Sequence, residues 1–286
     1  MSAGDLSIKA SASPGPSGAA TGPRAAGDVE VIAGDCATGL LLLCDHAANA
    51  MPPELGSLGL PPEQLERHIA YDIGAAEMTR ALAGALGAPA VLSHFSRLLI
   101  DPNRGLDDPT LVMRLSDGAL VPGNRHLDEA GVAERITRFY APYDAAITAA
   151  IERALAAGHP PAIVSMHSFT PFWKQAARPW HVGVLWDDPG ALAKLLIAAL
   201  RREKDLVVGD NEPYAGGLPG DTIDRHATRR GLPDVLIEVR QDLIATSHAA
   251  RGWGLRLAAV LPGCLAQLRR EQPASCDSTA VDRAPR

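Results

Sequence analysis

LLLLCDHAAN, residues 40–49, is the stretch of sequence from which the fold can be predicted. Four leucines and a cysteine form an apolar run, which Gly39 precedes and a turn with two prolines follows. Such a run is typical of a strand that is buried on both faces, as in the parallel sheet of an α/β protein. Asp45 and His46 come at its carboxyl end, where open α/β sheets place their ligand sites. The stretch therefore predicts a central strand that carries polar side chains to a site.

Similar apolar runs alternate with helical patterns along the rest of the chain. The predicted strands cover residues 29–33, 40–44, 89–93, 98–100, 162–166, 181–186, 206–208 and 234–239. The predicted helices cover residues 61–68, 73–87, 128–157 with a break near Pro142, 189–203 and 247–268. This alternation favours a three-layer α/β fold, with a mostly parallel (mixed) central sheet and helices on both faces.

The two ends of the chain differ in composition from the part between them. Residues 1–27 are rich in Ala, Ser, Gly and Pro, and lack both hydrophobic periodicity and the apolar stretch of a secretory signal. Residues 271–286 have the same character. Segments that bury little apolar surface stay disordered. We therefore expect two disordered ends and a single α/β domain over residues 28–270.

Composition and charge exclude several classes of partner. The 286 residues are 47% hydrophobic and carry a net charge of −6 with dispersed Lys and Arg, so we expect no nucleic-acid partner. No apolar run reaches the roughly 18 residues that cross a bilayer, so we expect no membrane partner. The four cysteines are Cys36, Cys44, Cys264 and Cys276. They show neither CxxC pairing nor the spacing of a disulfide scaffold, which fits a protein of the reducing cytoplasm.

Polar side chains follow several of the predicted strands, at the edge where the loops of a parallel sheet converge. They are Asp45 and His46, then Asp101, Asn103 and Arg104, then His167, and last Glu238 and Arg240. Two histidines and a carboxylate form a ligand set for zinc or another divalent metal, with one position open for water. A further carboxylate suits a general base, and the planar arginine fork suits a substrate carboxylate.

Each of these residues also has a purely structural interpretation. His46 and His167 could be hydrogen-bonded core histidines, and Asp72 could cap the helix that follows it. The arginines at positions 97, 104, 225 and 240 could be surface residues or partners of Asp101, Asp224 and Asp242. Glu238 is different, because a carboxylate within the apolar strand VLIEV is costly unless it is paired or bound to a metal. The sequence therefore favours a functional role for Glu238.

Seven motifs over residues 30–268 make the chain resemble the N-formylglutamate amidohydrolase family. They are CDHAAN (44–49), HIAYDIG (68–74), SRLLIDPNR (96–104), MHSFTP (166–171), GDNEPYAG (209–216), DRHATRRGLP (224–233) and LIEVRQDL (236–243). That family is distantly similar to zinc carboxypeptidases. Three short segments of this chain resemble carboxypeptidase motifs: DPNR, HSF and the EVR of the last motif. The resemblance implies a phosphorylase/hydrolase-like, zinc-carboxypeptidase-like fold. It also implies a substrate-carboxylate site at Asn103 and Arg104, a zinc ligand at His167 and a water-activating base at Glu238.

One departure from the carboxypeptidase pattern affects the metal site. That pattern takes two ligands from His-x-x-Glu, but the residue three positions after His46 is Asn49. A neutral amide oxygen is a poor replacement for a carboxylate at zinc. We therefore expect Asp72, from the next motif, to complete the set with His46 and His167, and Asp45 is the competing candidate.

The resemblance implies a zinc-dependent amidohydrolase of the cytoplasm that releases formate from an N-formyl acidic amino acid, such as N-formyl-L-glutamate in histidine catabolism. Its partner would be this small molecule, and the oligomeric state, monomer or small homo-oligomer, stays open. A second substrate carboxylate would meet Arg97, Arg225 or Arg240, and His226 would polarise the oxyanion. Two alternatives remain: an amidase or carboxypeptidase for another N-acyl amino acid or peptide, and a non-catalytic binding protein that retains the fold.

Overall fold

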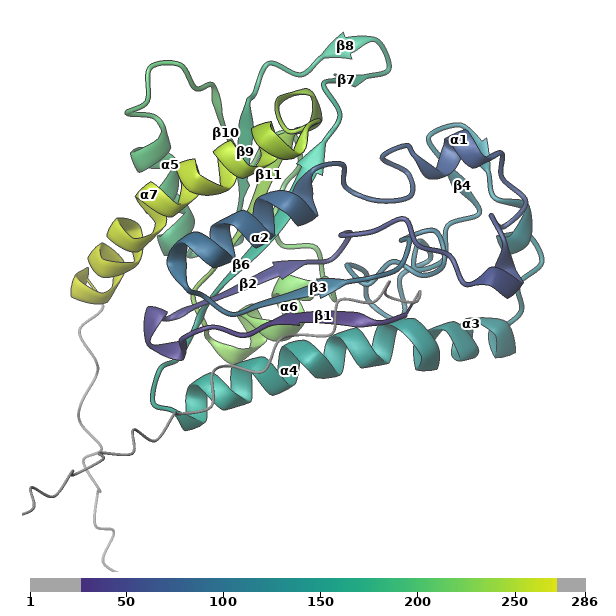
Figure 1. Cartoon of the computed structure of the whole chain (residues 1–286), viewed down its shortest axis with the longest axis horizontal. Coiled ribbons are helices and arrows are strands. Elements are labelled where there is room, and N and C mark those ends of the chain that lie inside the picture. The colour runs from purple at the N-terminus through teal and green to yellow at the C-terminus, as the bar shows by residue number, and fades with distance from the viewer. Residues whose placement is uncertain (1–26, 272–286) are drawn as a thin grey trace, which may run out of the picture.

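The computed structural model describes residues 27–271, so the two segments predicted to be disordered lie outside the described residues except at Gly27 and Glu271. Its centre is a seven-stranded sheet of order β1–β3–β2–β6–β11–β9–β10 (Figure 1). These strands are β1 (Val29–Ile32), β2 (Leu40–Cys44), β3 (Ala90–Ser93), β6 (Ala162–Phe169), β9 (Val182–Leu185), β10 (Val208–Asp210) and β11 (Asp234–Arg240). Two hairpins are separate from it: β4 (Leu115–Ser116) with β5 (Ala119–Leu120), and β7 (Phe172–Trp173) with β8 (Ala176–Ala177).

Four neighbouring strands in this sheet, β3, β2, β6 and β11, run parallel to one another. Edge strand β1 runs antiparallel to β3, and β9 runs antiparallel to β11 with β10 parallel to β9. The sheet is therefore mixed and mostly parallel, which confirms the prediction. Because β2, β6 and β11 are parallel neighbours, the residues at their carboxyl ends come to one edge of the sheet.

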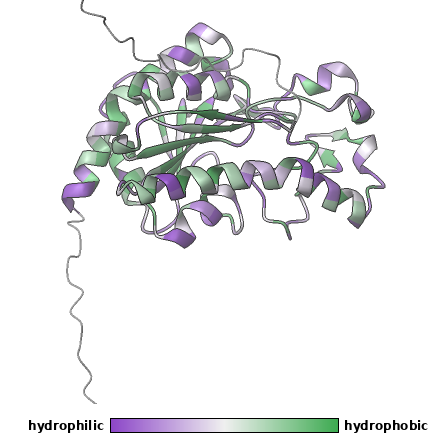
Figure 2. Ribbon diagram, turned by 60° about the horizontal axis from the view of Figure 1, so that its bottom comes forward, coloured by the Kyte–Doolittle hydropathy of each residue, from purple (hydrophilic) through white to green (hydrophobic). Residues whose placement is uncertain are grey.

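Helices cover both faces of the sheet (Figure 1). One face packs against α2 (Ala75–Leu86), α5 (Ala191–Leu200) and α7 (Ser247–Glu271), whose apolar side chains belong to one core cluster. The other face packs against α4 (Ala141–Ala156) and the short α6 (Thr222–His226), which belong to a second cluster. Figure 2 shows the apolar residues concentrated in the strands between these layers.

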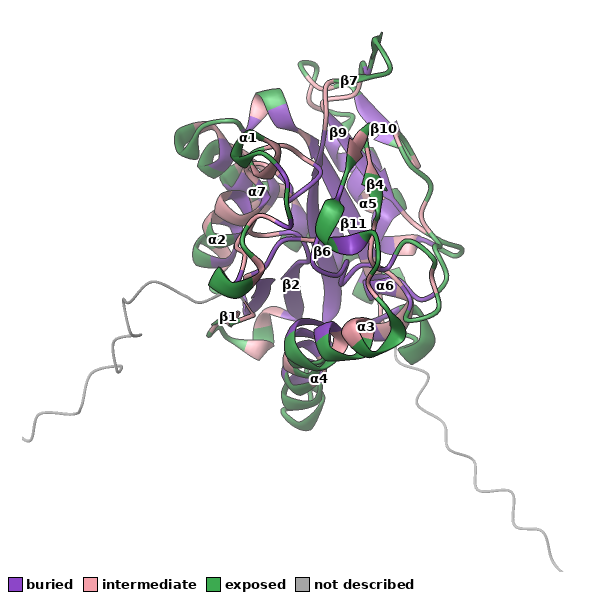
Figure 3. Ribbon diagram, turned by 90° about the vertical axis from the view of Figure 1, so that its right-hand side faces the viewer, coloured by how far each residue is buried: buried purple, intermediate pink, exposed green. Residues whose placement is uncertain are grey.

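Strand β2 contributes to both clusters. Leu40, Leu42 and Cys44 belong to the first cluster, whereas Leu41 and Leu43 belong to the second, and each of the five is at most 3% exposed. Successive side chains of a strand point to opposite faces. A strand that is apolar at every position is therefore the one that both helical layers cover, and Figure 3 shows the sheet buried between them.

Residues 98–100, predicted as a strand, form a turn at 98 and 99 and irregular backbone at 100 instead. Their side chains are fully buried, as the apolar pattern required. Two side chains donate hydrogen bonds to carbonyl oxygens that a neighbouring strand would otherwise have satisfied. Asn124 donates to the carbonyl oxygen of Leu98 at 2.8 Å, and Arg135 donates to that of Leu99 at 2.7 Å. Burial was thus predicted correctly, whereas the backbone conformation depended on polar partners elsewhere in the chain.

The helical stretch predicted over residues 128–157 is interrupted before the expected position. It consists of α3 (Glu129–Arg135), a π-helical turn (Ile136–Tyr140) and α4. Pro142 lies in the first turn of α4, where its missing N–H costs no helical hydrogen bond. The predicted helix at 61–68 is shorter, α1 (Pro62–Leu65). Among residues 27–271, no helix has the length and apolar character needed to cross a bilayer.

Candidate metal centre

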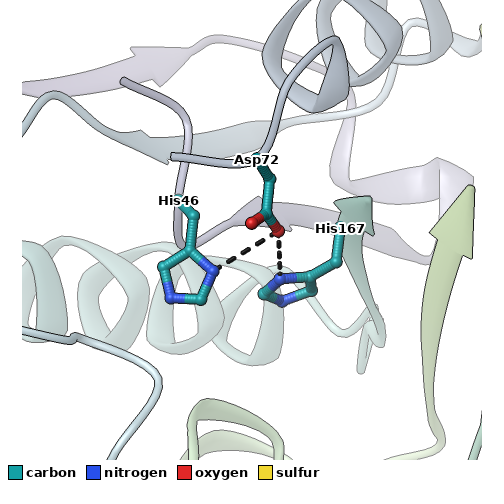
Figure 4. Close-up of side chains that lie close together, drawn as sticks. All are labelled: His46, Asp72 and His167. Atoms are coloured by element: carbon teal, nitrogen blue, oxygen red, sulfur yellow. Dashed lines mark hydrogen bonds and ion pairs between the residues drawn. The ribbon is translucent and has the colours of Figure 1, made fainter. Parts of the chain in front are cut away.

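Three buried side chains from distant parts of the sequence meet at the edge of the sheet (Figure 4). His46 follows β2, His167 lies near the end of β6, and Asp72 precedes α2. The Oδ2 atom of Asp72 lies 3.4 Å from Nδ1 of His46 and 2.8 Å from Nδ1 of His167. One ligand atom from each residue lies within 4.8 Å of the other two. A single divalent ion can therefore contact all three residues after small side-chain adjustments.

Asp72 does not cap helix α2, which was its structural alternative. The helix begins at Ala75, and its cap is Gly74 in a left-handed conformation. The backbone N–H of Asp72 donates to the carbonyl oxygen of His46 at 2.9 Å, which holds this loop beside the end of β2. The carboxylate of Asp72 is consequently available to the two imidazoles (Figure 4).

Both histidines turn Nδ1 toward Asp72 and have a second carboxylate at Nε2. His46 Nε2 lies 2.7 Å from Oδ1 of Asp101, and His167 Nε2 lies 3.1 Å from Oδ2 of Asp45. A carboxylate only accepts, so a metal ion that replaces the proton at Nδ1 would leave each Nε2 with its proton, donating to Asp101 or Asp45. Both Nδ1 atoms face the same point beside Asp72, and carboxylates behind histidine rings are the arrangement that orients histidine ligands.

Asp45 is completely buried and lies on the opposite side of the His167 ring from Asp72. Its Oδ1 accepts from Tyr143 at 3.0 Å and from Thr222 at 2.9 Å, and its Oδ2 accepts from Ser165 at 3.0 Å. Burial opposes ionisation, but the hydrogen bond and the charge of His167 lower the pKa of Asp45 to about 2. The oxygens of Asp45 are thus occupied in orienting His167, and Asp45 does not belong to the three-residue cluster.

The carboxylates also influence the protonation of His167. Burial disfavours its charged form, but the hydrogen bonds to Asp45 and Asp72 raise the pKa of His167 well above its usual value. A proton and a metal ion therefore compete for Nδ1 of this ring.

Asn49, the residue that departs from the carboxypeptidase pattern, lies outside the cluster. Its side-chain amide donates to the carbonyl oxygen of Leu65 at 2.9 Å and to Oε1 of Glu66 at 3.2 Å. Asn49 thus joins the strand end to the segment after α1, and the carboxylate of the cluster comes from Asp72.

Arg97 is paired with two of the buried carboxylates. Its Nη2 donates to Oδ2 of Asp101 at 2.6 Å, and its Nη1 lies 3.6 Å from Oδ1 of Asp72. Burial opposes ionisation of Asp101, but the charge of Arg97 lowers the pKa of that carboxyl well below its usual value. Arg97 is therefore an ion-pair partner of Asp101, which was its structural interpretation. It also lines the cavity next to the cluster.

This cavity has a volume of about 290 Å³. It contains seven of the ten residues predicted for the site: His46, Asp72, Arg97, Asn103, Arg104, His167 and Glu238. Other lining residues come from the segment after β6 and from the loop after β10, among them Phe169, Thr170, Tyr214 and Leu218. A space of this size accommodates a small amino-acid derivative.

Glu238 lies on β11 directly opposite His167 of β6 in the parallel ladder. Its residue is 8% exposed, and its Oε2 atom has no hydrogen-bond partner among the described residues. Burial raises the pKa of Glu238 to about 7, against the opposing charge of His167. A carboxyl with a pKa near neutrality can both accept and return a proton at physiological pH.

Asn103 and Arg104 lie in the loop that follows residues 98–100. The backbone N–H of Thr222 donates to Oδ1 of Asn103 at 3.0 Å, which anchors the loop on α6. Arg104 donates to the carbonyl oxygen of Asn103 at 2.8 Å and to Oγ1 of Thr110 at 3.1 Å. Its nearest carboxylate is Asp108 at 4.0 Å. The Arg104 guanidinium thus retains donor capacity for a ligand carboxylate in the cavity.

Arg225, His226 and Arg240 are not brought to the cavity. Arg225 Nε and His226 Nε2 both contact Oδ1 of Asp144 on α4, at 3.2 Å and 2.8 Å. Arg240 pairs with Asp242 at 2.7 Å and donates to the carbonyl oxygens of residues 178–180. These side chains hold structural elements together, and none of them lines the space beside the cluster.

Two residues beside the cavity were not among the sequence candidates. Tyr214 lines it, and Arg178 donates to the Tyr214 hydroxyl oxygen at 3.0 Å. Tyr214 belongs to the motif GDNEPYAG, which was the available signal for it. Arg178 lies outside all seven motifs and follows no predicted strand, so neither pattern distinguished it from the other arginines.

The mixed sheet, the buried carboxylate–histidine cluster and the adjoining cavity are features of a hydrolytic enzyme built on a three-layer α/β fold. The chain belongs to the N-formylglutamate amidohydrolase family, whose sequence profile matches residues 38–245. This confirms the resemblance found in the motifs and makes the protein an amidohydrolase by family.

Two solved structures have the same fold. Gene product Atu2144 from Agrobacterium tumefaciens is 32% identical with a TM-score of 0.78, over 84% of this chain and 96% of that one. N-formylglutamate amidohydrolase from Ralstonia eutropha JMP134 is 23% identical with a TM-score of 0.65, over 86% of this chain and 98% of that one. Among curated proteins, no sequence matches significantly.

Proposed function

We propose that this protein is a metal-dependent amidohydrolase that removes the N-formyl group of an acidic amino acid such as N-formyl-L-glutamate. Water adds to the formyl carbon, the C–N bond breaks, and formate and the free amino acid leave. The observation that carries the proposal is the placement of His46, Asp72 and His167 in one cavity with the unpartnered oxygen of Glu238. Family membership supports the reaction class.

The donor set fits zinc or a similar divalent ion. Two imidazole nitrogens and one carboxylate oxygen are ligands that zinc prefers, and carboxylates behind both rings orient them. When bound, such an ion supplies Lewis-acid activation of the water and the amide carbonyl. The buried oxygen of Glu238 also fits, since an unpaired carboxyl in an apolar strand needs a compensating cation or a functional role.

In this proposal Glu238 moves the protons of the reaction. Its carboxylate takes a proton from the attacking water and then gives it to the nitrogen of the leaving amine. A pKa of about 7 suits both steps, because neither transfer is strongly uphill at neutral pH. Asn103 and Arg104 bind the α-carboxylate of the substrate, which orients the amide beside Glu238.

In this proposal Arg97 does not bind a second substrate carboxylate, which was the role expected for it. Its charge is already shared by Asp101 and Asp72, so we assign it to holding these carboxylates. Arg225, Arg240 and His226 take no part, since their side chains bind Asp144 or Asp242 away from the cavity. We also propose a cytoplasmic location, which the free thiols of Cys36, Cys44 and Cys264 support.

The test measures formate release from N-formyl-L-glutamate by the zinc-loaded protein, the chelated protein and the Glu238→Gln variant. We expect chelation to abolish turnover and Glu238→Gln to lower kcat on the order of 10²- to 10⁴-fold. Glu134→Gln, which removes an exposed carboxylate on α3, serves as the matched control. Turnover that survives complete removal of metal would contradict the mechanism.

The same assay separates the two alternatives. A panel of N-acyl amino acids and peptides would reveal another amidase or carboxypeptidase by a preferred substrate other than N-formylglutamate. A protein that binds zinc and amino acids, yet turns over nothing in the panel, would be the non-catalytic binding protein.

A further inference from the structure

The segment after β6 places a second cationic group beside the cavity. Phe169 and Thr170, at the end of that strand, line the cavity. The chain then forms the β7–β8 hairpin, which projects beyond the sheet (Figure 1), and returns to Arg178. Tyr214, from the loop after β10, also lines the cavity. Arg178 itself is not a lining residue, but it contacts three residues that are, Phe169, Thr170 and Tyr214.

Arg178 is almost completely buried among aromatic rings. Its residue is 9% exposed, and its guanidinium carbon lies 5.0 Å from the ring centre of Tyr214, 5.4 Å from that of Trp173 and 5.7 Å from that of Phe169. Its Nη1 donates to the Tyr214 hydroxyl at 3.0 Å and to Oγ1 of Thr170 at 3.2 Å. The rings and these bonds hold the guanidinium in one orientation.

No carboxylate among residues 27–271 lies within ion-pair distance of Arg178, in contrast to Arg97 beside Asp101 and Arg240 beside Asp242. Its Nε and Nη2 groups make no hydrogen bond to a described residue, so these N–H donors remain available to an anion. A guanidinium that is mostly buried and has no counter-ion is less stable than a paired one. An anionic ligand group next to Tyr214 would supply the missing partner.

Tyr214 is suited to share such an anion. Its oxygen accepts from Arg178, so its own hydroxyl proton is free to be donated elsewhere. Burial and the charge of Glu238 raise the pKa of Tyr214, whereas Arg178 opposes this shift. The phenol therefore stays protonated at neutral pH and offers a donor from a residue that lines the cavity.

We propose that Arg178 and Tyr214 form the subsite for the side-chain carboxylate of the substrate and select acidic over neutral N-formyl amino acids. This inference rests on the proposed function, in which Asn103 and Arg104 bind the α-carboxylate from a different loop. The two carboxylates of the substrate are thus bound by two separate arginines. A charged carboxylate at a buried arginine is preferred over an amide on the order of 10- to 100-fold.

The test compares kcat/KM for N-formyl-L-glutamate and for N-formyl-L-glutamine, which has nearly the same shape but no side-chain charge. The wild type should prefer glutamate on the order of 10- to 100-fold. Arg178→Met should bring this ratio close to one by lowering the value for glutamate, and Tyr214→Phe should reduce the ratio by a smaller factor. Arg251→Met, which removes an exposed arginine on α7, should leave the ratio unchanged.

Three outcomes would overturn the subsite: a wild type without preference, an Arg178→Met variant with the wild-type ratio, or an equal loss for both substrates. Tyr214→Phe and Arg178→Gln, which removes the charge but keeps a polar side chain, keep the test decisive if Arg178→Met fails to fold, because an unchanged ratio in both would also overturn it. Calorimetry with L-glutamate and L-glutamine separates this inference from the proposed function. If the wild type has no amidase activity but binds L-glutamate more tightly than L-glutamine, and Arg178→Met removes this preference, the subsite is supported and the proposed reaction is refuted.

Discussion

Glu238→Gln should stabilise the metal-free protein, and increasingly so as the pH rises. Burial raises the pKa of Glu238 from 4.5 to about 7, and its Oε2 atom has no partner among the described residues. Between these two pH values the folded carboxyl keeps its proton, whereas the unfolded one loses it. The folded state therefore binds more protons than the unfolded state, and stability falls as pH increases through this window.

The magnitude follows from the size of the pKa shift. At about 1.4 kcal/mol per pKa unit, a shift from 4.5 to about 7 costs the wild type roughly 3 kcal/mol once Glu238 is ionised in both states. Most of this penalty, roughly 2.5 kcal/mol, develops between pH 5 and pH 8. Glutamine has nearly the shape of the protonated acid and does not titrate, so the variant escapes the penalty.

The assay is urea unfolding of the chelated wild type and of Glu238→Gln at pH 5 and pH 8. The variant should gain roughly 2.5 kcal/mol over the wild type between the two pH values, while groups that titrate alike in both proteins cancel in the comparison. Glu134→Gln, on the exposed side of α3, should show no such gain. A Glu238→Gln variant with the same advantage at both pH values, or with none, would refute the assignment of Glu238 as a buried, destabilising carboxylate.

Three further predictions concern the surroundings of the cluster. Zinc at 100 times its Kd should raise the free energy of unfolding by about 2.7 kcal/mol, and His167→Ala should abolish this gain in a denaturation assay; a gain retained by the variant would exclude His167 as a ligand. Gly74→Ala should cost roughly 1–3 kcal/mol and weaken zinc binding, because φ is +80° there and the new Cβ would lie 2.3 Å from the carbonyl oxygen of Ile244; urea unfolding and zinc titration measure both effects, and an unchanged midpoint would contradict the strain. Tyr143→Phe removes a donor to the buried Asp45 carboxylate and should cost about 1–3 kcal/mol in the same unfolding assay, whereas a neutral effect would show that the other donors suffice.

The cluster itself was predicted in part from local sequence. His46 and His167 were singled out because each follows an apolar run, and Asp72 because it lies in the motif after His46. The structure brings these three together. The competing residues have other partners: Asp45 contacts Nε2 of His167, and Asn49 donates to the carbonyl oxygen of Leu65. Which of several nearby oxygens faces a given ring depends on loop conformation, which periodicity does not specify.

The arginines show where sequence patterns reach their limit. Arg225 and Arg240 belong to family motifs, but their charges are taken up by Asp144 and Asp242. Arg178 belongs to no motif, yet it lacks an acidic partner among residues 27–271 and lies beside the cavity. Whether a cation is compensated depends on side chains that are distant in sequence, so only the folded chain decides it.

The sequence by itself determined the α/β class, the central strand at residues 40–44, the family and the identity of the two histidines. These follow from local periodicity and short motifs, because strands and helices repeat on the scale of a few residues. Tertiary structure alone decided which carboxylate joins the histidines and which arginines are free to bind a ligand. Those choices depend on distances between segments that are far apart in the sequence, where each buried charge is stabilised or left unpaired by its neighbours in space.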